Sequence, residues 1–114
     1  MHVFTGIVIK GKRRGTALGY PTLNIPLPPG SDVAGIYAGH AWLGHDEYRA
    51  AIFADPARGI LEVHLLDFSS DAYGKQLDVQ ILKKIREAKS FDTDEALKQA
   101  IAEDIGAVRQ YFSL

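Results

Sequence analysis

The sequence contains no cysteine, which excludes a disulfide scaffold, a thiolate metal site and catalysis by a cysteine nucleophile. It also lacks an excess of charge of one sign, because 13 basic and 14 acidic residues leave a formal net charge of -1. Bulk electrostatic capture of nucleic acid or anionic lipid is therefore not expected. The apolar runs fall far short of the roughly 20 residues that a membrane span needs, and residues 1–4 have no signal-peptide features. We expect a soluble cytoplasmic protein that binds neither nucleic acid nor membrane.

The length of 114 residues corresponds to one domain, and we expect residues 1–114 to form a single one. In the first three quarters of the chain, apolar residues recur with the period of two that is typical of β-strands. The predicted strands are residues 3–10, 35–43, 48–54, 60–66 and 76–85. Turn-forming residues separate them and no helix intervenes, so the pattern predicts an antiparallel barrel or sandwich.

Near the C-terminus the apolar spacing changes to that of an α-helix with one apolar face. This stripe consists of Leu97, Ile101, Ile105, Val108 and Phe112. Asp92 followed by Glu95 predicts an N-cap with its reciprocal partner at the third helical position. Gly106 costs such a helix about 1 kcal/mol relative to Ala. We therefore expect the helix to be held by packing its apolar stripe on the barrel.

The segment of residues 6–24 carries the densest chemistry. It contains Gly6, Gly11, Gly15 and Gly19 together with a basic cluster, Lys10, Lys12, Arg13 and Arg14. Glycines let backbone amides approach an anion closely, and concave runs of amides bind phosphate. An ordinary hairpin turn with a solvated basic cluster is the alternative. The segment matches neither the Walker pattern nor the dinucleotide-binding fingerprint.

A short extended segment follows this loop. Pro21 fixes its own φ and restricts Tyr20 to extended conformations. Thr22 and Asn24 are two residues apart and share one face if the segment is extended. A hydroxyl and an amide carbonyl are hard oxygen ligands that suit a magnesium ion which also binds water and nucleotide phosphates. Alternatively, these two side chains merely cap a turn.

The predicted strand at residues 60–66 places Leu61, Val63 and Leu65 on one face and Glu62 with His64 on the other. A carboxylate inside a barrel mouth is costly unless it is paired or functional, so Glu62 is the candidate general base. His64 fits a hydrogen-bonded structural histidine better than a second catalytic group. The four histidines have no metal-ligand spacing, which argues against zinc. Asp67, Asp71, Asp78 and the acidic residues of the final helix are interpreted as solvated surface.

These segments together resemble the riboflavin kinase family, and the resemblance covers nearly the whole chain. The matching motifs, in order, are Gly6-x-Val8-x-x-Gly11, Leu18-Gly19-Tyr20-Pro21-Thr22-x-Asn24, Gly35-Ile36-Tyr37-Ala38, Glu62-Val63-His64-Leu65-Leu66-Asp67-Phe68, Tyr73-Gly74-Lys75, Ile85-Arg86 and Phe91-Asp92. The resemblance implies a six-stranded antiparallel Greek-key barrel with a C-terminal helix. It also implies transfer of a phosphate from ATP to the ribityl 5′-hydroxyl of riboflavin, which gives FMN.

The resemblance assigns roles to particular residues. Thr22 and Asn24 would hold Mg²⁺, Glu62 would be the catalytic base, and the flavin would lie towards Arg86 and Phe91. The residues that would bind ATP and its phosphates are Gly11, Lys12, Gly15, Leu18, Gly19, Tyr20, Pro21 and Thr22. The expected partners are riboflavin, FMN, ATP and ADP, and we expect a monomer. Many bacterial relatives carry a further nucleotidyltransferase domain that makes FAD, and this chain alone is not expected to adenylylate FMN.

The sequence departs from the family pattern in two places. Thr16 stands where relatives usually have an arginine, and Arg13 or Arg14 could supply the missing phosphate contact. The loop before the strand of Glu62 is shortened to residues 52–59. A non-catalytic barrel that binds flavin or nucleotide is therefore the alternative to a kinase. A barrel that binds RNA or protein is a weaker one, supported only by the basic cluster at residues 10–14.

Overall fold

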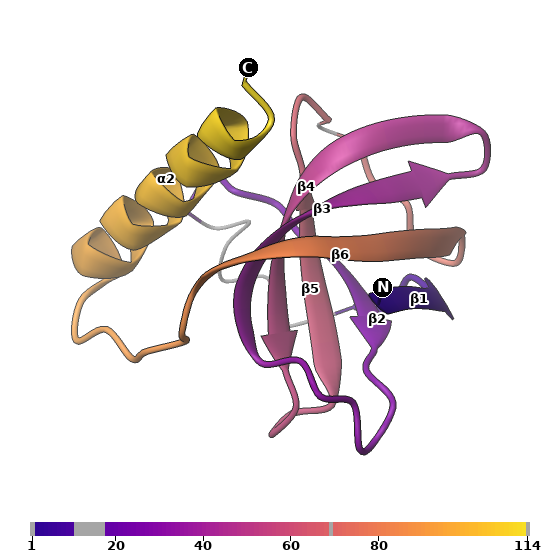
Figure 1. Ribbon diagram of the computed structural model, residues 1–114, viewed down its shortest axis with the longest axis horizontal. Helices are drawn as coiled ribbons and strands as arrows, with labels where there is room; N and C mark the ends of the chain where they lie inside the picture. Colours follow the sequence, from indigo (N-terminus) through magenta and orange to yellow (C-terminus); the bar gives the residue numbers. More distant parts are fainter. Residues whose placement is uncertain (1, 11–17, 69, 114) are drawn as a thin grey trace.

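The computed structural model describes residues 2–10, 18–68 and 70–113. Within them, antiparallel strands form one sheet that curls into a nearly closed barrel, and a helix lies against its outside (Figure 1). The strands are β1 (His2–Ile7), β2 (Leu23–Pro26), β3 (Gly35–Leu43), β4 (Asp46–Asp55), β5 (Ile60–Leu65) and β6 (Gln76–Arg86), and the helix is α2 (Asp94–Tyr111). The expected six-stranded barrel with a C-terminal helix is confirmed.

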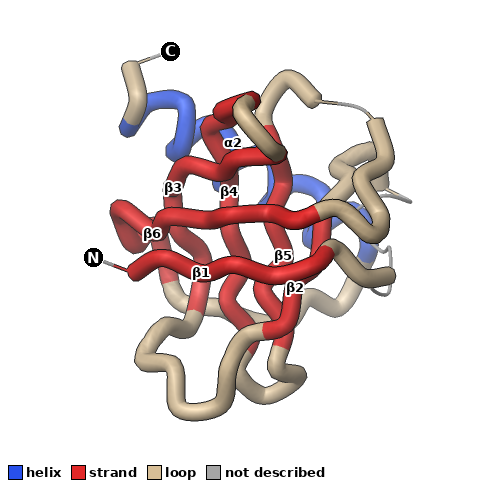
Figure 2. The backbone as a smooth tube through the Cα atoms, turned by 90° about the vertical axis from the view of Figure 1, so that its right-hand side faces the viewer, coloured by secondary structure: helices blue, strands red, loops and turns tan. Residues whose placement is uncertain are grey.

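The strand order is β1-β6-β3-β4-β5-β2, as can be followed in the tube view (Figure 2). β3, β4 and β5 are joined in succession, and β6 returns to lie beside β3, which is the Greek-key arrangement. The two edges of the sheet meet just after β1, where the amide of Ile9 donates a 2.8 Å hydrogen bond to the carbonyl of Asn24 in β2. This bridge joins the segment after β1 to β2, which pairs on its other side with β5.

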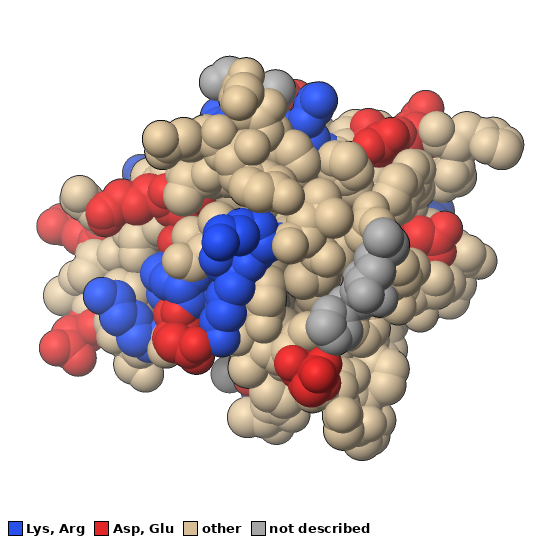
Figure 3. All heavy atoms as spheres, in the orientation of Figure 1, with Lys and Arg blue, Asp and Glu red and all other residues tan. Residues whose placement is uncertain are grey.

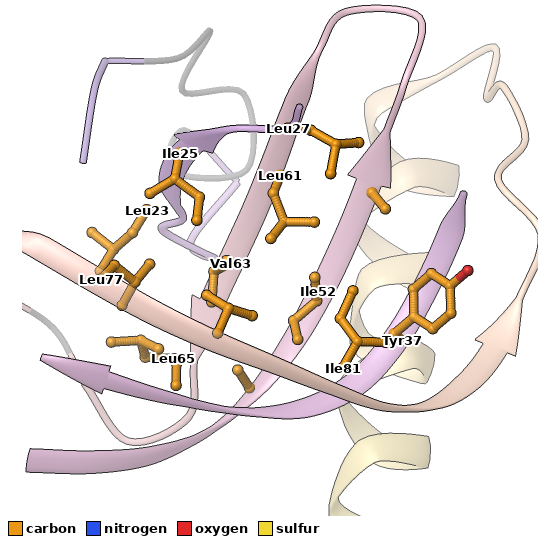
Figure 4. Close-up of a cluster of buried hydrophobic side chains, with 14 of the residues drawn as sticks. Leu23, Ile25, Leu27, Tyr37, Ile52, Leu61, Val63, Leu65, Leu77 and Ile81 are labelled. Carbon is orange, nitrogen blue, oxygen red and sulfur yellow. The ribbon is translucent and has the colours of Figure 1, made fainter. Parts of the chain in front are cut away.

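Alternation along the strands fills the barrel interior with aliphatic side chains (Figure 4). Ile25, Ile52, Leu61, Val63 and Leu77 are each 0% exposed. One of the strand glycines is required by this packing. A Cβ at Gly39 would lie 2.2 Å from the carbonyl oxygen of Gln80 and 2.5 Å from Ile52 Cδ1, so any other residue would push β3 away from β6.

The strand predictions were right for β3 and close for β1, β4, β5 and β6, whose ends differ from the predicted ones by at most three residues. The sequence pattern did not predict β2 as a strand, because it has only four residues and ends at a proline. Its pairing with β5 forms it, and a proline can close an edge strand because one side of that strand needs no donor.

The helix begins later than predicted. Thr93, not Asp92, is the N-cap: its backbone is extended and its hydroxyl accepts a 3.1 Å hydrogen bond from the amide of Ala96. The third helical position is then Ala96, so the predicted reciprocal partner Glu95 is also wrong. No helix in the described part of the chain has the length and apolarity to cross a membrane.

The apolar stripe of α2 has two parts. Val108 is fully buried against Ala38 and Leu66, with Ile105 and Phe112 beside it, which confirms that the helix packs its stripe on the barrel. Towards the N-terminus of α2, Leu97 and Ile101 line a cavity between the helix and the sheet.

Candidate active site

A cavity of about 280 Å³ lies between the outer face of the barrel wall and the N-terminal half of α2. Its walls come from β3, β4 and β5, from the segment before β2, from the loop between β6 and α2, and from α2 itself. Most of the lining is apolar, and the polar groups are gathered at two ends. Such a cavity, with a few convergent polar groups, is typical of a site for a small organic molecule.

The register of the sheet aligns the key residues of this cavity in one row. Asn24 of β2 lies opposite Glu62 of β5, Glu62 opposite Phe53 of β4, Phe53 opposite Ile36 of β3, and Ile36 opposite Arg86 of β6. Residues directly opposite one another in antiparallel strands share a face of the sheet. We call these five residues the cross-sheet row. It has an amide and a carboxylate at one end, two apolar side chains in the middle and a guanidinium at the other end.

The sequence analysis placed Glu62 inside the mouth of the barrel. In the structure, Glu62 lies on the outer wall of the barrel instead. The reason is the alternation of β5, in which Leu61, Val63 and Leu65 occupy the interior with exposures of 0%, 0% and 2%. Glu62 and His64 therefore face the cavity together, and both line it. The prediction that they share the face opposite the leucines is confirmed.

Glu62 is paired with Arg58, which stands in the turn between β4 and β5. Arg58 Nη2 donates to Glu62 Oε2 and Arg58 Nε donates to Asp55 Oδ2, each at 2.5 Å. Burial acts to raise the pKa of Asp55, but hydrogen bonds from the side chain and backbone of Arg58 outweigh it and hold that pKa below its ordinary 3.8. The hydrogen bond to Asp55 raises the pKa of Arg58. This cation therefore bridges two carboxylates.

Thr22 and Asn24 are the residues predicted to hold a metal ion. Thr22 lines the cavity. Asn24 is 3% exposed, and its buried Oδ1 has no hydrogen-bond partner in the part of the chain that the structure describes. A buried carbonyl oxygen without a partner costs roughly 1–3 kcal/mol, which a bound cation would offset. This oxygen, on a residue opposite Glu62 in the sheet, is compatible with a bound divalent cation.

Tyr20, Pro21 and His64 close the cavity beside Thr22. His64 Nδ1 lies 2.7 Å from the carbonyl oxygen of Pro21, and its ring meets that of Tyr20 edge to face at 6.0 Å between centroids. His64 thus makes the structural hydrogen bond expected of it, and it ties the end of the loop to β5. Gly19, just before, has a φ of +92°, which favours glycine at this position.

At the other end of the cavity, Arg86 is fixed by the helix. Its Nε and Nη2 donate to the two carboxylate oxygens of Asp104 at 2.7 and 2.8 Å, and its Nη1 donates to the carbonyl of Glu87 at 2.9 Å. Phe91 lies with its ring centroid 5.8 Å from the guanidinium carbon of Arg86 and 5.5 Å from Nζ of Lys89. A half-buried aromatic ring and a fixed guanidinium therefore stand together there.

The structure thus brings together five of the predicted site residues around one cavity: Tyr20, Thr22, Glu62, Arg86 and Phe91. Leu18, Gly19 and Pro21 adjoin its lining residues along the chain, and Asn24 lies opposite Glu62 in the pairing of β2 with β5. Gly11, Lys12 and Gly15, which were predicted to bind phosphate, are outside the described residues, as are Arg13, Arg14 and Thr16.

Sequence reasoning missed two residues of this site. Asp104, interpreted as solvated surface with the other helix acids, is 7% exposed and paired with Arg86. The signal was present, because Asp104 is three residues from Ile101 and four from Val108, within the apolar stripe, where a carboxylate needs a partner. Arg58 was missed because only the turn between β4 and β5 brings it back towards Glu62.

Elsewhere the surface carries mixed charge. Figure 3 shows basic and acidic side chains next to one another on the viewed face. One such contact, between Lys84 and Glu87, lies where β6 leads towards α2, and Arg109 of α2 pairs with Asp67 at 3.0 Å.

Fold and cavity together define a small β-barrel protein with a ligand cavity between the barrel wall and its C-terminal helix. The chain belongs to the riboflavin kinase family, whose family model matches residues 1–112. This confirms the resemblance on which the site residues were assigned.

Two curated relatives illustrate the match. An RNA-binding riboflavin kinase, RibR, of Bacillus subtilis (strain 168) is 36% identical over 121 residues, which cover 100% of this chain and 53% of that protein. A bifunctional riboflavin kinase/FMN adenylyltransferase of Escherichia coli (strain K12) is 37% identical over 123 residues, with coverages of 96% and 38%. The chain thus spans about half or less of the length of these relatives.

Solved structures agree on the fold. The crystal structure of a macrolide-efflux protein from Streptococcus pneumoniae superposes with a TM-score of 0.81 at 29% identity, covering 94% of this chain and 38% of that one. Riboflavin kinase from Trypanosoma brucei superposes with a TM-score of 0.69 at 23% identity, with coverages of 97% and 79%. The second of these similarities is evidence for the fold alone.

Proposed function

We propose that this protein transfers the γ-phosphate of ATP to the ribityl 5′-hydroxyl of riboflavin and so makes FMN. The observation that carries the proposal is the cross-sheet row. Its polar end, at Asn24 and Glu62, fits the reacting hydroxyl and the phosphates, and its other end, at Arg86, fits the polar edge of a flavin. Phe53 and Ile36 between them supply apolar surface for the ring system.

Spacing along the row supports this orientation. Neighbouring strands are about 4.8 Å apart, so the three steps from Glu62 to Arg86 span roughly 14 Å along the sheet. Riboflavin would lie along the row with its ribityl chain towards Glu62. Its isoalloxazine ring would lie near Phe91, where an aromatic face is available for stacking. Because Asp104 and Glu87 hold three nitrogens of Arg86, its guanidinium is fixed before the ligand arrives.

Glu62 is the proposed base. The 5′-oxygen of riboflavin attacks the γ-phosphorus, a new P–O bond forms, the bond from that phosphorus to the β,γ-bridging oxygen breaks, and ADP leaves. The hydroxyl proton passes to Glu62. Only Oε2 of Glu62 is occupied by Arg58, and Oε1 has no hydrogen-bond partner among the residues that the structure describes. That oxygen is available to accept the proton.

Thr22 and Asn24 would hold the metal, and the loop amides before them would hold the phosphates. Bound Mg²⁺ supplies charge neutralisation on the phosphate oxygens, which is the main requirement of phosphoryl transfer together with positioning. His64 contributes by fixing Pro21, because it anchors the segment from which Thr22 projects. We propose that the protein acts as a cytoplasmic monomer, and its net charge of -1 provides no bulk attraction for nucleic acid or anionic membrane.

The test is incubation of the purified protein with ATP, Mg²⁺ and riboflavin, followed by chromatographic separation of the flavins. We expect FMN and no FAD, and no FMN when Mg²⁺ is replaced by a chelator. If riboflavin and ADP both bind but no FMN forms, the non-catalytic flavin- or nucleotide-binding barrel is the correct interpretation.

A further inference from the structure

Arg58 has no role in the function proposed so far, although it makes the closest contact to the candidate base. We propose that Arg58 binds the phosphoryl group that is transferred, and that Asp55 and Glu62 hold its guanidinium at the cavity wall until that group arrives. This inference rests on the proposed function and adds to it a residue that recognises phosphate.

The first argument is geometric. Arg58 lines the same cavity as Thr22 and Glu62, and it reaches that cavity from the turn between β4 and β5. Glu62 is opposite Asn24, so the guanidinium stands at the end of the cross-sheet row where the phosphates are expected. The side chain of Arg58 is 34% exposed, so a ligand can reach it.

The second argument counts hydrogen-bond donors. A guanidinium has five N–H groups, and two carboxylates use one on Nε and one on Nη2. Nη1 donates to no group within residues 2–10, 18–68 and 70–113, so both of its N–H groups remain for a ligand. Arginine is well suited to this task, because its planar fork matches two oxygens of a phosphate.

The third argument concerns charge. The charged residues that line the cavity are Arg58, Arg86, Lys89, Glu62 and Asp104, which sum to +1. Asp104 already neutralises Arg86 at the flavin end. Asp55 and Glu62 outnumber Arg58 by one charge, so the guanidinium reduces, and does not cancel, the repulsion between the Glu62 carboxylate and a phosphoryl group. Without Arg58, the proposed base and the incoming phosphate would be adjacent like charges.

A purely structural role is the competing explanation. The amide of Arg58 also donates to Asp55 Oδ1 at 3.3 Å, and Gly59 closes the turn on Pro56 at 3.3 Å. These contacts stabilise the turn, but they need only the backbone and Asp55. The side chain also braces the turn through Nε and Asp55, but its Nη2 contact with Glu62 lies beyond the turn and holds the cation at the cavity wall.

The experiment compares the affinities for FMN and riboflavin, which differ only by the phosphoryl group. Flavin fluorescence would be titrated with wild-type protein, Arg58→Ala, Arg58→Gln, Arg58→Lys and Arg109→Ala, all in Mg²⁺. Arg109→Ala is the matched control, because it also removes an arginine from an ion pair with an aspartate but lies outside the cavity lining. Arg58→Gln keeps a hydrogen-bonding side chain in the turn should the alanine variant fold poorly.

We expect Arg58→Ala and Arg58→Gln to weaken FMN binding about tenfold while riboflavin binding changes less than about threefold, as loss of one hydrogen bond between charged groups predicts. Arg58→Lys should retain part of the preference and Arg109→Ala all of it. Equal weakening of both flavins, or an unchanged ratio, would overturn the role of Arg58. If wild-type protein prefers FMN through Arg58 but forms no FMN from riboflavin, the proposed kinase activity is refuted and the role of Arg58 in binding the phosphoryl group stands.

Discussion

Replacement of Glu62 by glutamine tests the central assignment of this site. The variant keeps the length and hydrogen-bonding shape of the side chain but cannot accept a proton at neutral pH. General-base assistance contributes about 10²–10⁴-fold, so we expect turnover to fall at least about 100-fold. Binding of riboflavin and ADP should persist, because neither ligand is proposed to depend on the charge of Glu62.

The structure also sets the expected effect of this change on stability. Glu62 and Arg58 have side chains 21% and 34% exposed, and partly exposed ion pairs contribute about 0.2–1 kcal/mol. A buried cation stranded without a partner would cost about 3–5 kcal/mol. Arg58 is not stranded, because its Nε still donates to Asp55. We therefore expect the free energy of unfolding to fall by less than about 1 kcal/mol.

Urea unfolding and steady-state turnover should be measured on one preparation. A variant that is destabilised by several kcal/mol but retains normal activity per folded molecule would refute both the catalytic role of Glu62 and this account of its ion pair. Arg109→Ala provides the reference for the loss of a surface pair.

Three further predictions follow from the other contacts. Asp104→Asn should lower the free energy of unfolding by about 1–3 kcal/mol and weaken riboflavin binding, because it leaves the guanidinium of Arg86 partly buried without its carboxylate. Urea unfolding measures the first effect and flavin titration the second. Asn24→Leu should stay within about 1 kcal/mol of wild-type stability yet lose Mg²⁺-dependent ADP binding more than metal-free binding; equal loss would mean that Asn24 serves the fold. The pKa of Asp55 in the folded protein lies below 3.8, so the stabilising contribution of its carboxylate is complete above that pH and is lost as the pH falls through the folded-state pKa. The difference in unfolding free energy between wild type and Asp55→Asn, measured by urea unfolding, should therefore shrink on acidification below about pH 4.

The barrel was predictable because apolar and polar residues alternate along most of its strands. In β5 every second residue is aliphatic, so the sequence predicts both the strand and which side chains face outward. β2 was not predictable as a strand for the opposite reason. Its four residues become a strand only through pairing with β5 and the bridge from Ile9, and neither partner is near it in sequence.

The helix start illustrates a different limit. Asp92 and Thr93 are both competent N-caps, and their sequence neighbourhood favours Asp92 because Glu95 follows at capping-box spacing. In the structure Thr93 takes the cap, with an extended backbone and a hydroxyl that accepts the hydrogen bond from the amide of Ala96.

Residue types and spacing indicated Thr22, Asn24 and Glu62, whereas Arg86 and Phe91 were indicated only by the family resemblance. The arrangement of these residues was not predictable. Asn24, Glu62 and Arg86 are widely separated in the chain, and nothing in their local sequence indicates that they share a row. The row arises because the Greek-key order places β2 next to β5 and β6 next to β3, with β4 in the middle. A shift of one residue in any of these pairings would turn at least one of the three side chains into the barrel interior.

This dependence on register explains why the aliphatic interior matters for the chemistry. Ile52, Leu61 and Val63 pack inside the barrel and so fix which residues of β4 and β5 face the helix. Gly39 does the same for β3, since a side chain there would collide with β6 and disturb the pairing that positions Arg86. The two ends of the proposed riboflavin site are thus held at a constant separation by hydrophobic packing on the opposite face of the same strands. Arg58 and Asp104, which the sequence did not reveal, then orient the charged groups at each end of that row.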